Sequence, residues 1–278
     1  MNRRSPGRLL WIWTVQQVRQ LFRNPQASFF TIVFPLLFLG LFGGLNHGAT
    51  LDVGGGRITF AQYYTPGLAI FAVVTSCLTG LVISVAIERD QLILKRIRST
   101  PLPPWIYITA RIGSTVVMAI VTALVLFLVG TLALGVHVYP RMLPAAIVTF
   151  LLGTATFAAI GMAVSCLVPN SDAAPAIGNI VALPIVFISG VFFPLQGAPT
   201  WLVKIADFLP LIHLVRAFVA TFTPFTPGSG FAPHELLPVA LWGIAATVFA
   251  ARRFRWEPAP GKTGRPEKER RTLVRARA

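Results

Sequence analysis

Ile87–Trp105 is the one internal stretch of the sequence that is dense in charged side chains. Long apolar runs without a charge lie on both sides of it. Because a charged side chain is costly in the hydrocarbon of a membrane, we expect this stretch to lie outside it. The chemistry that it offers is ion pairing with another polar surface. Its charged residues are Glu88, Arg89, Asp90, Lys95, Arg96 and Arg98.

The sequence has no clear place for ion coupling or for catalysis. Ion-driven carriers place acidic or histidine side chains at membrane depth, but all nine acidic residues fall at or beyond the ends of the apolar runs. The histidines lie in polar turns or in a segment broken by prolines, and they form no H-x-x-x-H pair. We therefore predict no catalytic residue and no metal site. The histidines are His47, His137, His213 and His234.

The sequence also lacks a motif for ATP hydrolysis by this chain. A phosphate-binding loop needs the pattern G-x-x-x-x-G-K-[ST] after a strand. The nearest match is Gly261, Lys262 and Thr263, but Trp256 occupies the place of the first glycine. We therefore expect no cofactor on this chain.

The composition indicates an integral membrane protein. Of the 278 residues, 55% are hydrophobic and only 12% are charged, and the mean hydropathy is +0.71. The formal charge of +15 comes from basic residues between and beyond the apolar runs. That distribution is typical of a membrane protein and not of a surface that binds nucleic acid. Cys77 and Cys166 both lie in apolar segments, so no disulfide framework is expected.

Residues 9–23 have the pattern of an amphipathic helix. Aromatic and aliphatic side chains recur at spacings of three and four, so they share one face, and polar side chains occupy the other. Such a helix lies on the membrane surface, in contact with lipids. An ordinary juxtamembrane anchor is the alternative interpretation. The residues that we single out in this helix are Trp11, Arg19, Phe22 and Arg23.

Six apolar segments are predicted to cross the membrane, which makes the fold class all-α integral membrane. A crossing of about 30 Å of hydrocarbon takes roughly 20 residues. The membrane domain covers residues 1–253, and residues 254–278 are expected to form a basic, disordered cytoplasmic tail. The predicted spans are residues 27–45, 65–87, 107–136, 142–168, 173–193 and 236–251.

The charged stretch between the second and third spans is predicted to form one short helix over Glu88–Arg98. Pro101, Pro103 and Pro104 cannot continue that helix, and they impose an abrupt turn into the next span. The result is a short cationic surface at the membrane face. An ordinary loop whose basic residues only fix the orientation is the alternative.

The segment Ser189–Thr226 is apolar but broken by prolines and charges, so it has no uncharged run long enough to cross. We predict that the fifth span ends near Phe193 and that one or two short re-entrant helices follow on the outer side. The residues expected to shape this outer segment are Pro194, Trp201, Pro210, His213 and Arg216.

The basic residues also predict the orientation. With six spans and the N-terminus inside, twenty Lys and Arg residues fall in cytoplasmic segments and four in outer ones. The positive-inside rule favours this arrangement, and a seventh span would place the basic tail outside. Both termini are therefore expected in the cytoplasm.

Three motifs make the chain resemble the membrane subunits of ABC type-2 exporters, the bacterial permeases for drugs, lipids and polysaccharides. The first is Q-Y-Y-T-P-G-L at Gln62–Leu68. The second is E-R-D-Q-L-I-L-K-R-I-R-S-T-P-L-P at Glu88–Pro103. The third is S-G-V-F-F-P-L-Q-G-A-P-T-W-L at Ser189–Leu202, followed by L-P-L-I-H-L-V-R-A-F at Leu209–Phe218. The similarity runs in order along nearly the whole chain.

The resemblance implies a dimer of six-span subunits, identical or different, in the bacterial inner membrane. It implies two cytoplasmic ATPase subunits, which carry the ATP and Mg²⁺. It further implies that Glu88–Arg98 is the coupling helix, that the helix near Trp11–Arg23 also contacts the ATPase, and that Pro194–Phe218 caps the exit. The candidate coupling residues are Glu88, Arg89, Lys95, Arg96 and Arg98.

The function expected from the resemblance is ATP-driven export of a hydrophobic or amphipathic solute, such as a drug, a lipid, a glycolipid or a polysaccharide. A channel or secondary carrier that works without an ATPase is the first alternative. A membrane-embedded enzyme that modifies lipids is the second. The sequence identifies neither the solute nor the choice between homodimer and heterodimer.

Overall fold

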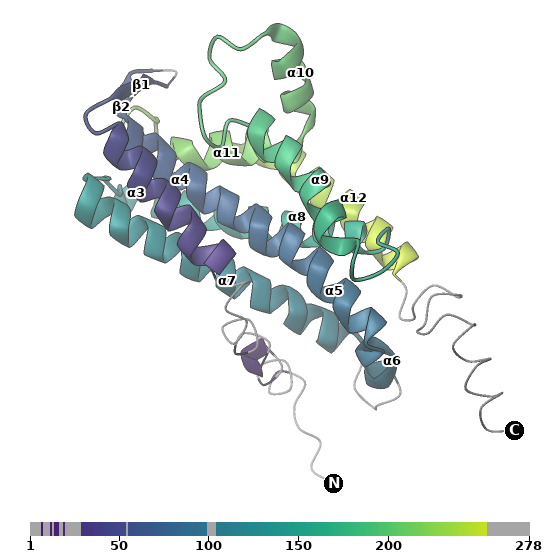
Figure 1. The fold of residues 1–278 in the computed structure, drawn as a ribbon. Helices are drawn as coiled ribbons and strands as arrows, with labels where there is room; N and C mark the ends of the chain where they lie inside the picture. Colours follow the sequence, from purple (N-terminus) through teal and green to yellow (C-terminus); the bar gives the residue numbers. More distant parts are fainter. Residues whose placement is uncertain are drawn as a thin grey trace, which may run out of the picture.

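The computed structural model describes residues 7, 12, 14–16, 19, 29–53, 55–98 and 104–254. Its helices lie side by side in an elongated bundle, with α6 at one end and α10 and a β-hairpin at the other (Figure 1). In chain order the elements are η1 (Phe29–Val33), α3 (Phe34–Leu45), β1 (Thr50–Asp52), β2 (Arg57–Thr59), α4 (Phe60–Val73), η2 (Val74–Thr79), α5 (Gly80–Asp90), α6 (Ile93–Arg98), α7 (Pro104–Leu134), η3 (Pro140–Met142), α8 (Leu143–Ser165), α9 (Ala174–Ile188), α10 (Thr200–Phe208), α11 (Pro210–Ala220) and α12 (Pro233–Arg253).

One long helix organises the bundle. It consists of α4, η2 and α5, which follow one another without a break from Phe60 to Asp90. Thr59 begins it as an N-cap, because its hydroxyl accepts a hydrogen bond from the Gln62 N–H. Every residue of α4 is buried, and α3, α7, α8, α9 and α11 all contact the long helix. It therefore forms the core and exposes little surface to lipid.

The long helix widens into a π-helix at η2, where two neighbouring helices approach it closely through glycines. A Cβ added at Gly161 of α8 would lie 2.5 Å from the carbonyl oxygen of Cys77. A Cβ added at Gly178 of α9 would lie 3.3 Å from the Thr79 side chain. Small residues at such contacts let backbones pack closely in membrane proteins.

The segment that follows α9, residues 189–199, lies directly against α4. A Cβ added at Gly67 would collide with the Val191 carbonyl group. The Tyr63 hydroxyl donates a hydrogen bond of 2.5 Å to the Gly190 carbonyl oxygen. Gly190 has φ of +73°, which favours glycine and ends the helical path after Ile188. These contacts hold the segment in a fixed place on the central helix.

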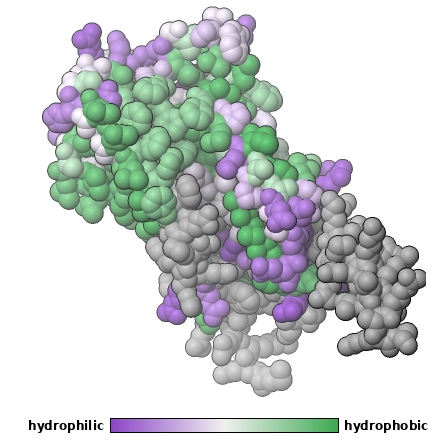
Figure 2. Space-filling view, in the orientation of Figure 1, coloured by the Kyte–Doolittle hydropathy of each residue, from purple (hydrophilic) through white to green (hydrophobic). Residues whose placement is uncertain are grey.

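The surface confirms that this is a helical membrane protein. By length and composition, four helical stretches can cross a membrane: Phe60–Asp90, Ile106–Leu134, Pro140–Ser165 and Pro233–Arg253. The helices α3, α9 and α11 are shorter and apolar. Figure 2 shows a broad hydrophobic surface on the body of the bundle, with hydrophilic residues toward its ends. Large exposed apolar side chains include Leu37, Leu41, Leu124, Leu128, Ile180, Phe187, Leu241 and Ile244.

The limits of the predicted spans differ from the observed helices mainly at their ends. The second helix covers residues 60–90 and not 65–87, because it starts at the Thr59 cap and continues through the first charges. The fifth ends at Ile188 and not at 193. Within the described residues four stretches, and not six, meet the length of a full crossing, so the six-span arrangement stays a prediction.

Residues 46–62, which lie mostly between the first two predicted spans, contain regular structure that has no clear signal in the sequence. Here β1 and β2 pair antiparallel, with Thr50 opposite Thr59 and Asp52 opposite Arg57. The last three residues of this range already belong to α4. The fold is therefore helical with one small hairpin. The prediction of one or two short helices before the last span is confirmed, since α10 and α11 lie there.

Candidate functional site

A buried ion pair joins the end of the central helix to α7. Arg111 Nη1 lies 3.4 Å from Glu88 Oε1. The two residues are 5% and 6% exposed, so neither meets solvent. The Arg111 Nε also donates to the Ser84 hydroxyl at 3.2 Å. A buried pair of this kind is costly to break, because the remaining charge would be left in an apolar environment.

The next two residues tie the same helix end to the segment after α8. Arg89 donates from Nη1 to the Ser165 carbonyl oxygen at 3.3 Å and from Nη2 to the Val168 carbonyl oxygen at 2.5 Å. The Asp90 carboxylate accepts a 2.6 Å hydrogen bond from the Ser171 N–H. Three consecutive charged residues, starting at Glu88, thus fix the end of α5 to α7 and to the chain around the end of α8.

A sharp break then separates α5 from α6. Leu92 has φ of +58°, a conformation rarely adopted by a residue with a side chain. Beyond it, Leu94 is fully buried and packs with Tyr107 of α7. Lys95 and Arg96 of α6 are exposed. The short helix therefore anchors one apolar side chain and presents two cations at the end of the bundle.

The structure divides the predicted coupling residues into two groups. The prediction of a single helix over Glu88–Arg98 was wrong, because the turn at Leu92 splits it. Glu88 and Arg89 belong to the long helix and are buried, so they lie inside the subunit and not on the charged surface that α6 presents. Lys95 and Arg96 lie on that surface. The backbone of Arg98 is helical, and its side chain lies outside what the structure describes.

Most of the predicted N-terminal helix lies outside the described residues. Trp11, Phe22 and Arg23 are among those positions. Arg19 is described, and it is helical and exposed. The predicted basic tail lies outside the description from residue 255 onward.

At the opposite end of the bundle, an ionic cluster joins α10, α11 and the start of α12. Arg216 Nη1 lies 2.8 Å from Asp207 Oδ1 and 4.0 Å from Glu235 Oε1. His213 Nδ1 lies 2.5 Å from Glu235 Oε2, and its Nε2 lies 2.8 Å from the Asp207 carbonyl oxygen. The imidazole thus lies between a carboxylate of α12 and a backbone carbonyl group of α10.

The other residues that were predicted to shape the outer segment lie outside this ionic cluster. Pro210 is the first residue of α11, where a missing N–H costs nothing. Pro194 lies in the segment after α9 and lines a pocket there. Trp201, on α10, is 62% exposed. The structure therefore brings His213 and Arg216 into one cluster and leaves Trp201 on the surface.

Sequence analysis missed the role of Gln62, which connects three separate parts of the chain. Its side-chain N–H groups donate to the carbonyl oxygens of His137 and Phe222, each at 2.7 Å. Its Oε1 accepts from the His137 N–H at 2.8 Å. Gln62 is only 4% exposed. The one available signal was a polar residue at the edge of an apolar run, in the Gln62–Leu68 motif.

Within residues 29–53, 55–98 and 104–254, no group of three or more His, Cys, Asp and Glu side chains is arranged to hold a metal ion. The site is thus a set of ion pairs and hydrogen bonds at the two ends of one long helix.

Comparison with known proteins places these features in a family. Residues 8–223 match the family model described as ABC-2 type transporter. The chain is 23% identical over 200 residues to "Putative transport permease YvfS" of Bacillus subtilis (strain 168), covering 72% of this chain and 80% of that protein. It is 27% identical over 203 residues to "Putative transport permease ycf38" of Pyropia yezoensis, covering 72% and 68%.

A shorter match is with Nodulation protein J of Rhizobium leguminosarum bv. viciae, 39% identical over 59 residues, which covers 21% of this chain and 23% of that protein. The family model covers far more than half of the chain and includes both ends of the central helix, α6 and the α10–α11 pair. The chain therefore belongs to the ABC-2 type transporter family.

Proposed function

We propose that this chain is the membrane subunit of an ATP-driven exporter, with ATP and Mg²⁺ bound by separate ATPase subunits. Its cargo is a hydrophobic or amphipathic solute, such as a drug, a lipid, a glycolipid or a polysaccharide. The solute leaves the cytoplasm or the inner leaflet through a dimer, either of two copies or with a second permease chain. In this arrangement the α6 end faces the cytoplasm of a bacterium, and both termini of the chain are cytoplasmic.

One observation carries the proposal, namely the contrast between the exposed and the buried charges around α6. Lys95 and Arg96 are exposed at the tip of the bundle. Directly behind them, Glu88 and Arg89 are buried and bonded to α7 and to the segment after α8. An ATPase that moves α6 would therefore move the long helix and its neighbours with it. Arg98, at the end of α6, is assigned to the same contact surface.

The buried residues have a different part in this proposal from the exposed ones. Lys95 and Arg96 contact the ATPase. Glu88 and Arg89 hold the end of α5 in place, so that a movement of α6 is passed on to the rest of the bundle. The helix near Trp11, Arg19, Phe22 and Arg23 adds a second contact with the ATPase or the lipid surface. The α10–α11 pair, with its partly exposed ionic cluster, serves as the outer gate.

The test is a charge reversal on α6. The chain, purified from its native membrane, should bring down an ATP-binding subunit, and the pair should export a fluorescent amphiphile in proteoliposomes when ATP is added. The double variant Lys95→Glu/Arg96→Glu should lose at least roughly tenfold in recovered ATPase, because several charge pairs become repulsive. Arg57→Glu is the matched control, since Arg57 is an exposed cation at the other end of the bundle.

Full recovery of the ATPase by the double variant would contradict the assignment of α6. Uphill transport by the purified chain without any nucleotide hydrolase would contradict the function itself. That second result would favour a secondary carrier.

A further inference from the structure

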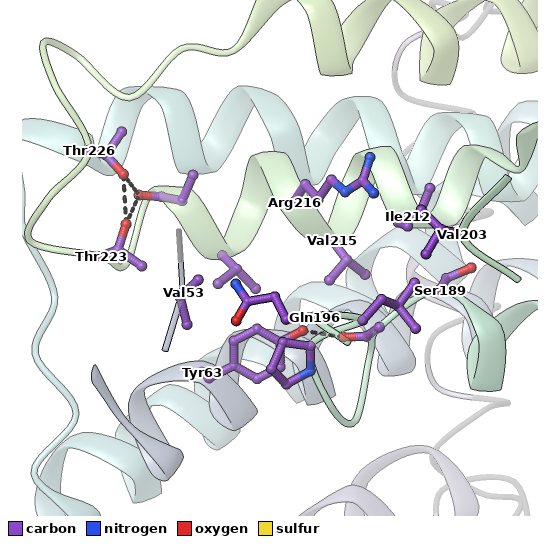
Figure 3. A pocket seen from close by; sticks show the side chains of 15 residues that line it. Val53, Tyr63, Ser189, Gln196, Val203, Ile212, Val215, Arg216, Thr223 and Thr226 are labelled. Carbon is purple, nitrogen blue, oxygen red and sulfur yellow. Dashed lines mark hydrogen bonds between the residues drawn. The ribbon is translucent and has the colours of Figure 1, made fainter. Parts of the chain in front are cut away.

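A pocket lies near the outer gate, between α4, residues 189–199 and α11 (Figure 3). Its volume is about 380 Å³. Pockets that bind small molecules have volumes of roughly 300–1,000 Å³. One wall is rigid, because the Tyr63 hydroxyl is bonded to Gly190 and Gly67 lies against Val191. The pocket is therefore a formed site of the right size for a small ligand.

Apart from Arg216, the polar side chains on the lining are uncharged. The hydroxyls of Thr223 and Thr226 lie 2.6 Å apart, and both lie within hydrogen-bond distance of the Ala220 carbonyl oxygen (Figure 3). These contacts use both hydroxyl hydrogens, so the oxygens are left as acceptors for a ligand. Gln196 is exposed and adds an amide group. The polar lining thus suits a ligand that both donates and accepts hydrogen bonds.

The charges near the pocket are balanced within the protein. Arg216 is the cation on the lining, and it is already paired with Asp207 at 2.8 Å. Glu235, at 4.0 Å, adds a second negative charge beside the same guanidinium group. An anionic ligand would have to compete with these carboxylates. The balance therefore favours an uncharged ligand over an anionic one.

The remaining lining is aliphatic. Val203 of α10 and Ile212 and Val215 of α11 contribute apolar side chains on the wall away from Tyr63 (Figure 3). Val219 of α11 also lines the pocket. Such a wall binds the apolar part of a ligand by removing it from water.

We propose that this pocket binds an uncharged amphiphile with hydroxyl or amide groups beside an apolar body. The polar part contacts Gln196 and the two threonines, and the apolar part packs on the α11 valines. Binding here requires no ATPase, so the proposal is separate from the exporter function and can fail or succeed independently.

The test is equilibrium dialysis of the full chain in lipid nanodiscs against 4-nitrophenyl β-D-glucoside, an uncharged probe with a sugar and an aromatic ring. 4-Nitrophenyl phosphate is the matched charged probe. The expected result is saturable glucoside binding that the phosphate does not compete away. Thr226→Val should weaken binding by about fivefold, the effect of one lost hydrogen bond. Thr122→Val is the matched control, since Thr122 is a buried threonine bonded within α7.

A second variant keeps the test decisive if Thr226→Val does not fold. Val203→Trp places a large ring at a half-buried position on the lining and should abolish glucoside binding. Absence of saturable glucoside binding to the wild type would overturn the proposal. So would equal binding of the phosphate probe, or glucoside binding that survives in both pocket variants.

Discussion

The two ends of the bundle use the same kinds of charged residue in opposite environments. At the α6 end, the Glu88–Arg111 pair has side chains only 7% and 6% exposed. At the α10–α11 end, the Asp207–Arg216 pair has side chains 44% and 41% exposed. Water screens the second pair and not the first, so the cost of separating the charges is far greater at the α6 end.

This difference suits two mechanical roles. A joint that must transmit movement needs contacts that stay closed, and the buried network of Glu88, Arg89 and Asp90 provides them. A gate that must open needs contacts that exchange readily with water, and the cluster around Arg216 has that character. Gln62 lies between the two cases, since it is buried but uncharged.

The largest effect is expected from breaking the buried pair. Glu88→Leu leaves Arg111 in an apolar environment and should lower the free energy of unfolding in detergent by about 3 kcal/mol. The double variant Glu88→Leu/Arg111→Leu should recover most of that loss, because no charge stays buried. Chemical denaturation of the three proteins measures both values. A Glu88→Leu variant as stable as the wild type would contradict the proposal that the Glu88–Arg111 pair makes the end of α5 rigid.

A smaller effect is expected at Gln62. Gln62→Leu removes three hydrogen bonds and leaves buried backbone groups at His137 and Phe222 without their partner. The expected loss is about 2 kcal/mol, since the new side chain fills similar space but satisfies none of these groups. Denaturation of this variant beside Gln91→Leu, at an exposed position after α5, isolates the buried contribution. Equal stabilities of the two variants would count against it.

The smallest effect on stability is expected at the α10–α11 end, where we propose the outer gate. Asp207→Asn should change the free energy of unfolding by less than about 1 kcal/mol, because the pair with Arg216 is partly exposed. The same change should alter the rate of export, since it weakens the closed state of the gate. Transport assays in proteoliposomes measure that rate. A large loss of stability here would erase the contrast between the two ends.

The positions of the long helices could be predicted from the sequence, because an apolar run long enough to cross a membrane must satisfy its backbone hydrogen bonds internally, as a helix does. The two short helices after α9 followed in the same way from prolines and charges, among them Pro194 and Pro210. Helix ends were less certain. The start at Phe60 depends on the Thr59 cap, a local hydrogen bond that hydropathy does not detect.

The division of the charged stretch could not be predicted, because it depends on tertiary contacts. Arg89 bonds to carbonyl groups that lie 76 and 79 residues away in the sequence. Gln62 bonds to groups 75 and 160 residues away. The break between α5 and α6 rests on Leu92 in a conformation that leucine rarely adopts, and its neighbours in sequence give no sign of it.

The most direct test of the account is site-specific cross-linking from α6 to the ATPase. Single cysteines replace Lys95, Arg96 or, as the control, Arg57, in a background where Cys77 and Cys166 are alanine. A short thiol-to-amine cross-linker is then added to membranes that contain the whole transporter. The account predicts adducts with an ATP-binding subunit from positions 95 and 96 and none from 57. Adducts from 57 alone would contradict it.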